Sequence, residues 1–163
     1  MAGREELALI AELGVGFVGF VSVFLIFARR EGGFSPADGY RVRAIVLSAL
    51  EAVFFALLPL ILDLYGLAGT NLWRSASALG LLALIATTVH LGSKQRALSP
   101  EARAELVGVA APWVLAVITC LLYLSNIAAV FHEPTAAPYV AAMVACLAIA
   151  ALNFVTIAFQ RLL

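Results

Sequence analysis

Two acidic residues lie in long apolar stretches, and they are the residues of this sequence best suited to chemistry. Glu51 occurs in the segment Ser48-Ala49-Leu50-Glu51-Ala52-Val53, and Glu12 lies near the start of the first apolar stretch. A carboxylate is costly to remove from water, so at membrane depth it is protonated, paired or turned toward a cavity. Such a group offers reversible binding of a proton or a cation. The competing interpretation is a protonated carboxyl that only bonds a neighbouring helix.

Glu51 is the stronger candidate because of its depth. In a helix whose apolar part runs from 44 to 63, it lies close to the midplane at a rise of about 1.5 Å per residue, too deep to snorkel. Glu12 is five residues inside its stretch, where a carboxylate is still able to reach the headgroups. Glu12 shares a helix face with Gly16 and Gly19. Small residues of this kind favour close helix packing, so we expect Glu12 to be internal and the two glycines to form a packing face.

Polar residues in the last two apolar stretches are the expected partners of these acids. Counted from the helix centres, Asn153 comes near the level of Glu51, and Tyr123 comes near the level of Glu12. Asn126 shares a helix face with Tyr123. We predict Asn153 as the first hydrogen-bond partner of Glu51. Polar stripes also hold membrane helices together without moving a solute, and this plainer alternative stays open.

The other reactive residues form no recognisable site. His90 and His132 are predicted at opposite membrane surfaces, and Cys120 and Cys146 stand alone in apolar stretches. The sequence has no nucleophile elbow, P-loop, GxGxxG or HExxH motif. We therefore expect no metal, no cofactor and no enzymatic activity. The formal net charge is zero, so no bulk field attracts nucleic acid.

Five apolar stretches are long enough to hold these residues across a bilayer. Apolar residues make up 64% of the 163 residues and charged residues 12%, against about 45–50% and about 25% in soluble domains. A spanning helix needs about 20 mostly apolar residues. Ser-Pro pairs at 35–36 and 99–100 are typical helix starts, with Ser as N-cap and Pro at the first helical position. The predicted helices are approximately 7–28, 36–66, 72–92, 100–131 and 138–161.

The basic residues predict the orientation of this all-α bundle. Eight Lys and Arg residues lie in the segments 29–43 and 93–105 or at position 161, all on one side of five spans, and only Arg4 and Arg74 lie on the other side. Basic residues remain in the cytoplasm, so the N-terminus is expected outside and the C-terminus in the cytoplasm. Trp73 and Tyr139, near helix ends, are predicted to anchor the chain at the membrane surface. We expect a single transmembrane domain in the inner (cytoplasmic) membrane of a bacterium.

The small size of the bundle indicates that one chain does not act alone. Five short helices enclose little volume, so we expect the chain to act with further copies or with other membrane subunits in the lipid bilayer. The leading hypothesis is an oligomeric channel or transporter subunit for protons or a cation, with Glu51 as the site and Glu12 at its outer approach. The alternative is an accessory or assembly subunit that packs through Gly16 and Gly19 and moves nothing.

Overall fold

The computed structural model describes residues 3–30, 34–106, 110–129 and 133–162, and within these ranges every regular element is an α-helix. The helices are α1 (Arg4–Arg30), α2 (Pro36–Leu64), α3 (Gly69–Arg96), α4 (Pro100–Ala104), α5 (Ala110–Ala128) and α6 (Ala136–Leu162). All except α4 are long and apolar enough to cross a membrane. The prediction of an all-helical membrane protein with five helices able to span the bilayer is confirmed.

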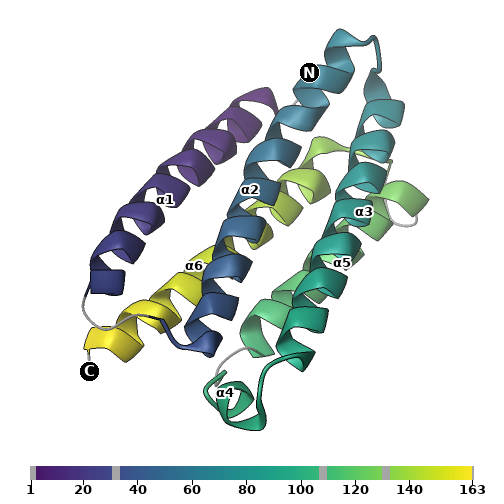
Figure 1. Cartoon of the computed structure of the whole chain (residues 1–163). Helices are drawn as coiled ribbons and strands as arrows, with labels where there is room; N and C mark the ends of the chain where they lie inside the picture. The colour runs from purple at the N-terminus through teal and green to yellow at the C-terminus, as the bar shows by residue number, and fades with distance from the viewer. Residues whose placement is uncertain (1–2, 31–33, 107–109, 130–132, 163) are drawn as a thin grey trace.

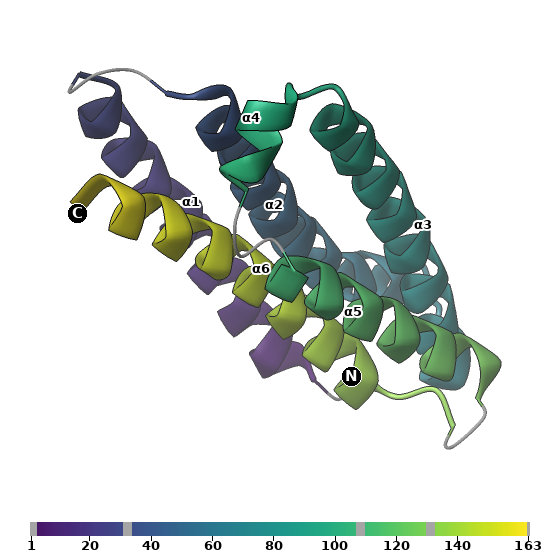
Figure 2. The same cartoon turned by 90° about the horizontal axis from the view of Figure 1, so that it is seen from below.

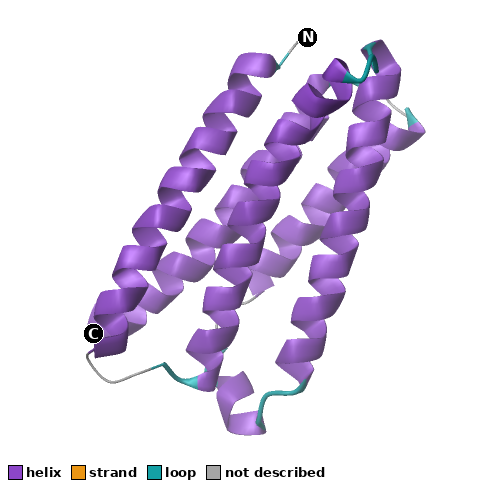
Figure 3. Cartoon of the chain, turned by 45° about the horizontal axis from the view of Figure 1, so that its top comes forward, coloured by secondary structure: helices purple, strands orange, loops and turns teal. Residues whose placement is uncertain are grey.

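The five long helices form two layers. Figure 1 shows α1, α2 and α3 in front and α5 and α6 behind them, and the views in Figures 2 and 3 agree. The central helix α2 packs on α1, α3 and α6, and α5 packs on α3 and α6. The start of α2, the end of α3 and the short α4 lie together at one end of the bundle, which we call the α4 end (Figure 1).

Both predicted Ser-Pro helix starts are confirmed. The Ser35 hydroxyl accepts the backbone N–H of Asp38 at 3.2 Å, and the Asp38 carboxylate accepts the N–H of Ser35 at 3.3 Å, which completes a capping box. The Ser99 hydroxyl accepts the N–H of Ala102 at 3.2 Å. These caps satisfy backbone donors that have no partner within a helix.

The prediction of one continuous helix over 100–131 is wrong. The helix that begins at Pro100 ends at Ala104, and α5 begins at Ala110; residues 107–109 lie outside the described part. Pro112 provides a physical reason, because its ring would collide with the carbonyl of residue 108 in a continuous helix and it has no N–H to donate. In the first turn of α5 that N–H would have no intrahelical partner in any case.

Tyr139 of α6 compensates for a proline inside α2. Pro59 cannot donate a hydrogen bond to the carbonyl of Phe55, and the Tyr139 hydroxyl donates to that carbonyl at 2.6 Å. The Tyr139 ring is fully buried, and its centroid lies 5.7 Å from that of Trp73, which is also buried. The prediction that Trp73 and Tyr139 are surface anchors is therefore wrong, because both rings join helices inside the bundle.

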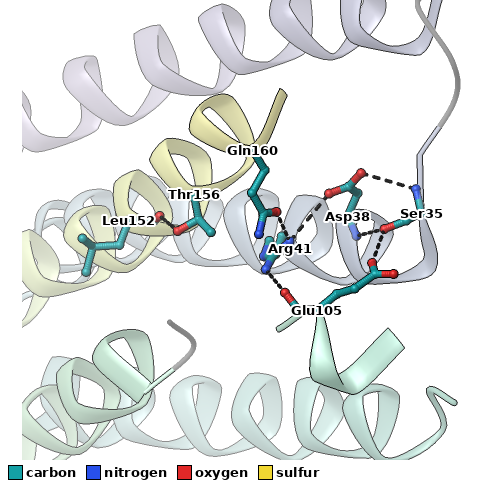
Figure 4. Close-up of polar contacts among 7 residues, drawn as sticks. All are labelled: Ser35, Asp38, Arg41, Glu105, Leu152, Thr156 and Gln160. Atoms are coloured by element: carbon teal, nitrogen blue, oxygen red, sulfur yellow. Dashed lines mark hydrogen bonds and ion pairs between the residues drawn. The ribbon is translucent and has the colours of Figure 1, made fainter. Parts of the chain in front are cut away.

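The α4 end is held together by Arg41, a cation of α2 that is only 2% exposed. Its Nη1 donates to Oε1 of Gln160 in α6 at 2.6 Å, and its Nη2 donates to the backbone carbonyl of Glu105 at 2.5 Å, directly after α4. Nη1 also lies 3.7 Å from the carboxylate of Asp38. The Ser35 hydroxyl donates to the Glu105 carboxylate at 3.0 Å. As Figure 4 shows, one side chain thus ties α2, α4 and α6 together.

Candidate functional site: the Glu51 cavity

Glu51 lies in the interior of the bundle, near the middle of α2. Its Oε1 accepts a hydrogen bond from the Thr87 hydroxyl of α3 at 2.6 Å. Within the described part of the chain, no other hydrogen bond reaches this carboxyl group. One oxygen is therefore held by α3, and the second has no protein partner there.

The predicted partner of Glu51 is not the observed one. Asn153 lines the same cavity as Glu51, but its amide donates to the carbonyl of Ile149 in its own helix at 2.8 Å. The prediction that Asn153 is the first hydrogen-bond partner is therefore wrong: the Asn153 amide is directed to its own helix, and Glu51 bonds Thr87 instead. The sequence signal that points to the observed partner is the Thr87-Thr88 pair in the otherwise apolar stretch 81–89 of α3.

A cavity extends from Glu51 toward the α4 end, between α2, α3, α5 and α6. The centres of water molecules can occupy about 40 Å³ of this cavity. One water molecule needs about 10–15 Å³ on this measure. A few water molecules therefore fit beside the carboxyl group. The polar side chains of the wall come from three helices: Tyr40, Ser48, Glu51, Thr87, Thr88 and Asn153.

On the other side of Glu51, buried side chains fill the bundle. The Tyr123 ring is 2% exposed and its centroid lies 5.9 Å from that of Tyr139. Both belong to a core cluster that also contains Met143 and Cys146. A Cβ added to Gly80 would lie 2.6 Å from Cζ of Tyr123, so α3 approaches α5 closely because Gly80 has no side chain. The cavity thus lies on the α4 side of Glu51.

Glu12 lies on the outer face of α1, away from the other helices. Its side chain is exposed, whereas Tyr123, its predicted partner by level, is buried in the core. A Cβ added at Gly16 or Gly19 would meet no atom of a neighbouring helix within 4 Å. Within this chain, the predictions of an internal Glu12 and of packing through Gly16 and Gly19 are therefore wrong.

A different face of α1 packs against α2. Gly14 is the glycine of close approach, since its added Cβ would lie 2.5 Å from Cγ2 of Val53. The buried residues of this face recur at helical spacing: Leu7, Ile10, Ala11, Gly14 and Val21. Both faces of α1 are apolar, so hydrophobic periodicity did not reveal which one meets α2.

Asn126 joins two helices and a loop near the end of the bundle opposite α4. Its amide nitrogen donates to the Ser77 hydroxyl of α3 at 2.9 Å and to the Thr135 carbonyl at 3.1 Å. Its amide oxygen accepts the N–H of Thr135 at 2.9 Å. Asn126 is fully buried; its bond to Ser77 joins α5 to α3, and its two bonds to Thr135 hold the start of α6 against α5. At Asn126 the arrangement fits the plainer alternative, in which the polar side chains hold membrane helices together and move no solute.

In the described ranges, no three His, Cys, Asp or Glu side chains gather as a metal site would require. His90 is exposed, and His132 lies outside the described residues.

Comparison of the chain with protein-family models, curated proteins and solved structures found no match. The Glu51 cavity is therefore the feature on which a functional argument rests.

Proposed function

We propose that this protein is a subunit of a small membrane channel or transporter that handles protons, and that Glu51 takes up and releases the proton. The observation that carries the proposal is the Glu51 carboxyl beside a cavity large enough for water, with one oxygen bonded to Thr87. Ionisable groups at this depth mark ion and proton pathways in membrane proteins. Water in the cavity would extend hydrogen bonding from the carboxyl group toward the buried Tyr40 on the α4 side.

The donors around the cavity favour a proton over a metal cation. The wall offers one carboxyl group with hydroxyl and amide groups, whereas Ca²⁺ takes about 6–8 oxygen ligands and Mg²⁺ requires an octahedron. A proton needs no ligand shell and passes between hydrogen-bonded groups.

The orientation of the chain in the membrane and its assembly follow from the loops and from the extent of the cavity. The Lys and Arg residues of the loops support an α4 end in the cytoplasm and an N-terminus outside, in the inner membrane of a bacterium. Because the cavity stops at Glu51, passage to the other side requires a second conformation or a neighbouring subunit. We therefore propose that the chain works as a homo-oligomer or together with other membrane subunits.

Proton flux through reconstituted vesicles tests the role of Glu51. With a pH-sensitive dye inside the vesicles and a potassium diffusion potential as driving force, the wild-type protein should carry protons faster than protein-free vesicles. Glu51→Gln should reduce the rate to that of protein-free vesicles, because an amide cannot release a proton. Its oxygen still accepts the Thr87 hydroxyl, so the fold should be kept.

Asp63→Asn is the matched control. Asp63 is an exposed acid at the far end of the same helix, and neutralising it should leave the flux unchanged. Equal flux in wild type and Glu51→Gln would contradict the proton-binding role. A wild-type rate no higher than that of empty vesicles would contradict transport as a whole and would favour the second function below.

The second candidate function, an accessory or assembly subunit, is favoured by the outer face of α1. Glu12, Gly16 and Gly19 lie together on that face without a partner helix in the described part of this chain. An acid in a spanning helix is costly to expose to lipid, and small residues let a second helix approach closely. A neighbouring subunit on this face would cover both features.

Oligomeric mass in detergent tests this second function. The double variant Gly16→Leu/Gly19→Leu should shift the particle measured by light scattering toward a single chain, because the added side chains hold the helices apart. Val15→Leu, off the line of glycines, should leave the mass unchanged. An assembly that keeps its mass in the double variant does not use this face.

A further inference from the structure

We propose that α2 and α3 form a binding pocket for the phosphate group of an anionic phospholipid at the α4 end. The pocket lies between the first turns of α2 and the end of α3. The centres of water molecules can occupy about 280 Å³ of it. Its wall includes Gly39, Tyr40 and Arg43 from α2, and Lys94 and Leu98 at the end of α3 and after it. This inference does not depend on proton transport.

The two cations of the pocket are available for a ligand. Arg43 and Lys94 are exposed, and neither has an acidic partner among the described residues. Two other basic residues of this end are engaged in the fold. Arg41 ties three helices together, and the Arg103 guanidinium donates to the carbonyl of Leu98 at 3.1 Å. Arg43 and Lys94 therefore present an uncompensated positive charge on one concave surface.

The depth of the pocket matches the phosphate layer of a bilayer. The hydrogen bond between Glu51 and Thr87 sets a common level for α2 and α3. Arg43 is eight residues from Glu51 toward the α4 end and Lys94 is seven from Thr87, which is about 12 Å and about 10 Å along a helix. Half of the hydrocarbon core is about 15 Å. The long side chains of both residues reach from there to the headgroups.

The shape and chemistry of the wall favour a lipid over free phosphate. Arginine binds phosphate oxygens in a bidentate manner, and lysine adds a second charge. Tyr40 and Leu98 provide apolar surface for the glycerol and the upper acyl chains. A Cβ added at Gly39 would meet no atom within 4 Å, so the floor of the pocket is open at this residue. Inorganic phosphate would use the charges but not the apolar wall.

Native mass spectrometry of the detergent-solubilised protein tests this inference with phosphatidylglycerol as the probe and phosphatidylcholine as the zwitterionic comparison. Wild type should retain phosphatidylglycerol preferentially. Arg43→Gln/Lys94→Gln should weaken its apparent affinity about 30-fold, from the attraction of two cations near a membrane surface. Both side chains are exposed, so an unchanged thermal midpoint should show that the double variant is folded.

Two further variants separate a pocket from general attraction. Gly39→Leu keeps both charges but fills the pocket, and it should reduce phosphatidylglycerol binding to a similar extent. Arg96→Gln removes an exposed cation of the same end that does not line the pocket, and it should bind as wild type does. Equal binding of the two lipids, or full binding by Gly39→Leu, would overturn the inference. Displacement of phosphatidylglycerol by an equal concentration of inorganic phosphate would also overturn it, in favour of a free-phosphate site.

Discussion

Arg41→Met should lower the free energy of unfolding by about 3 kcal/mol, because it removes one partner from a buried charged network. Methionine fills similar space but leaves the Glu105 carbonyl and the Gln160 amide oxygen without their donor, and Asp38 without its cation. Titration with sodium dodecyl sulfate in mixed micelles measures this loss. We also expect faster proteolytic cleavage between α3 and α5, since α4 is no longer tied to α2 and α6.

Arg43→Met is the matched control for this effect. Arg43 lies two residues further along the same helix and is exposed, so its replacement should change the unfolding free energy by less than about 0.5 kcal/mol. Arg41→Lys should be intermediate, because an ammonium group keeps the charge but cannot reproduce the planar fork that reaches α4 and α6 together. Equal stability of the two methionine variants would show that the Arg41 network contributes nothing.

Gly80→Ala should destabilise the bundle by about 2 kcal/mol, since one methyl group is too large for the contact between α3 and α5. The new Cβ would lie 2.6 Å from the ring of Tyr123. That ring is 2% exposed and packs against Tyr139, so it has no free space into which to move. The helices must separate instead, and this should also loosen Thr87, two turns along α3.

Gly92→Ala provides the comparison on the same helix. A Cβ at Gly92 would lie 3.9 Å from the ring of Trp113, which is ordinary contact. This variant should be neutral or should gain up to about 1 kcal/mol from the higher helix propensity of alanine. Unfolding titrations of both variants in the same micelles measure the difference. Equal stability would mean that the approach of α3 to α5 at Gly80 is looser than the observed contact.

Local features of the sequence determined the long apolar helices, two helix starts and the position of one acid within its helix. Each apolar stretch is long enough by itself to cross a bilayer, so the number of long helices needed no tertiary information. Ser35 and Ser99 cap their helices through bonds to residues three positions later. The sequence also puts Glu51 near the middle of its helix, and the structure puts this residue in the bundle interior.

Neighbouring helices decided what those local features left open. Thr87, not Asn153, bonds Glu51, because the Asn153 amide is directed to a carbonyl of its own helix while the Thr87 hydroxyl of α3 is directed to the carboxyl group. The outward direction of Glu12 depended on which of two apolar faces of α1 meets α2. Lipid and protein interior are equally apolar, so hydrophobic periodicity does not distinguish a face that meets lipid from one that meets a helix. That choice depends on shape, and contacts such as Gly14 with Val53 exist only once the helices are packed.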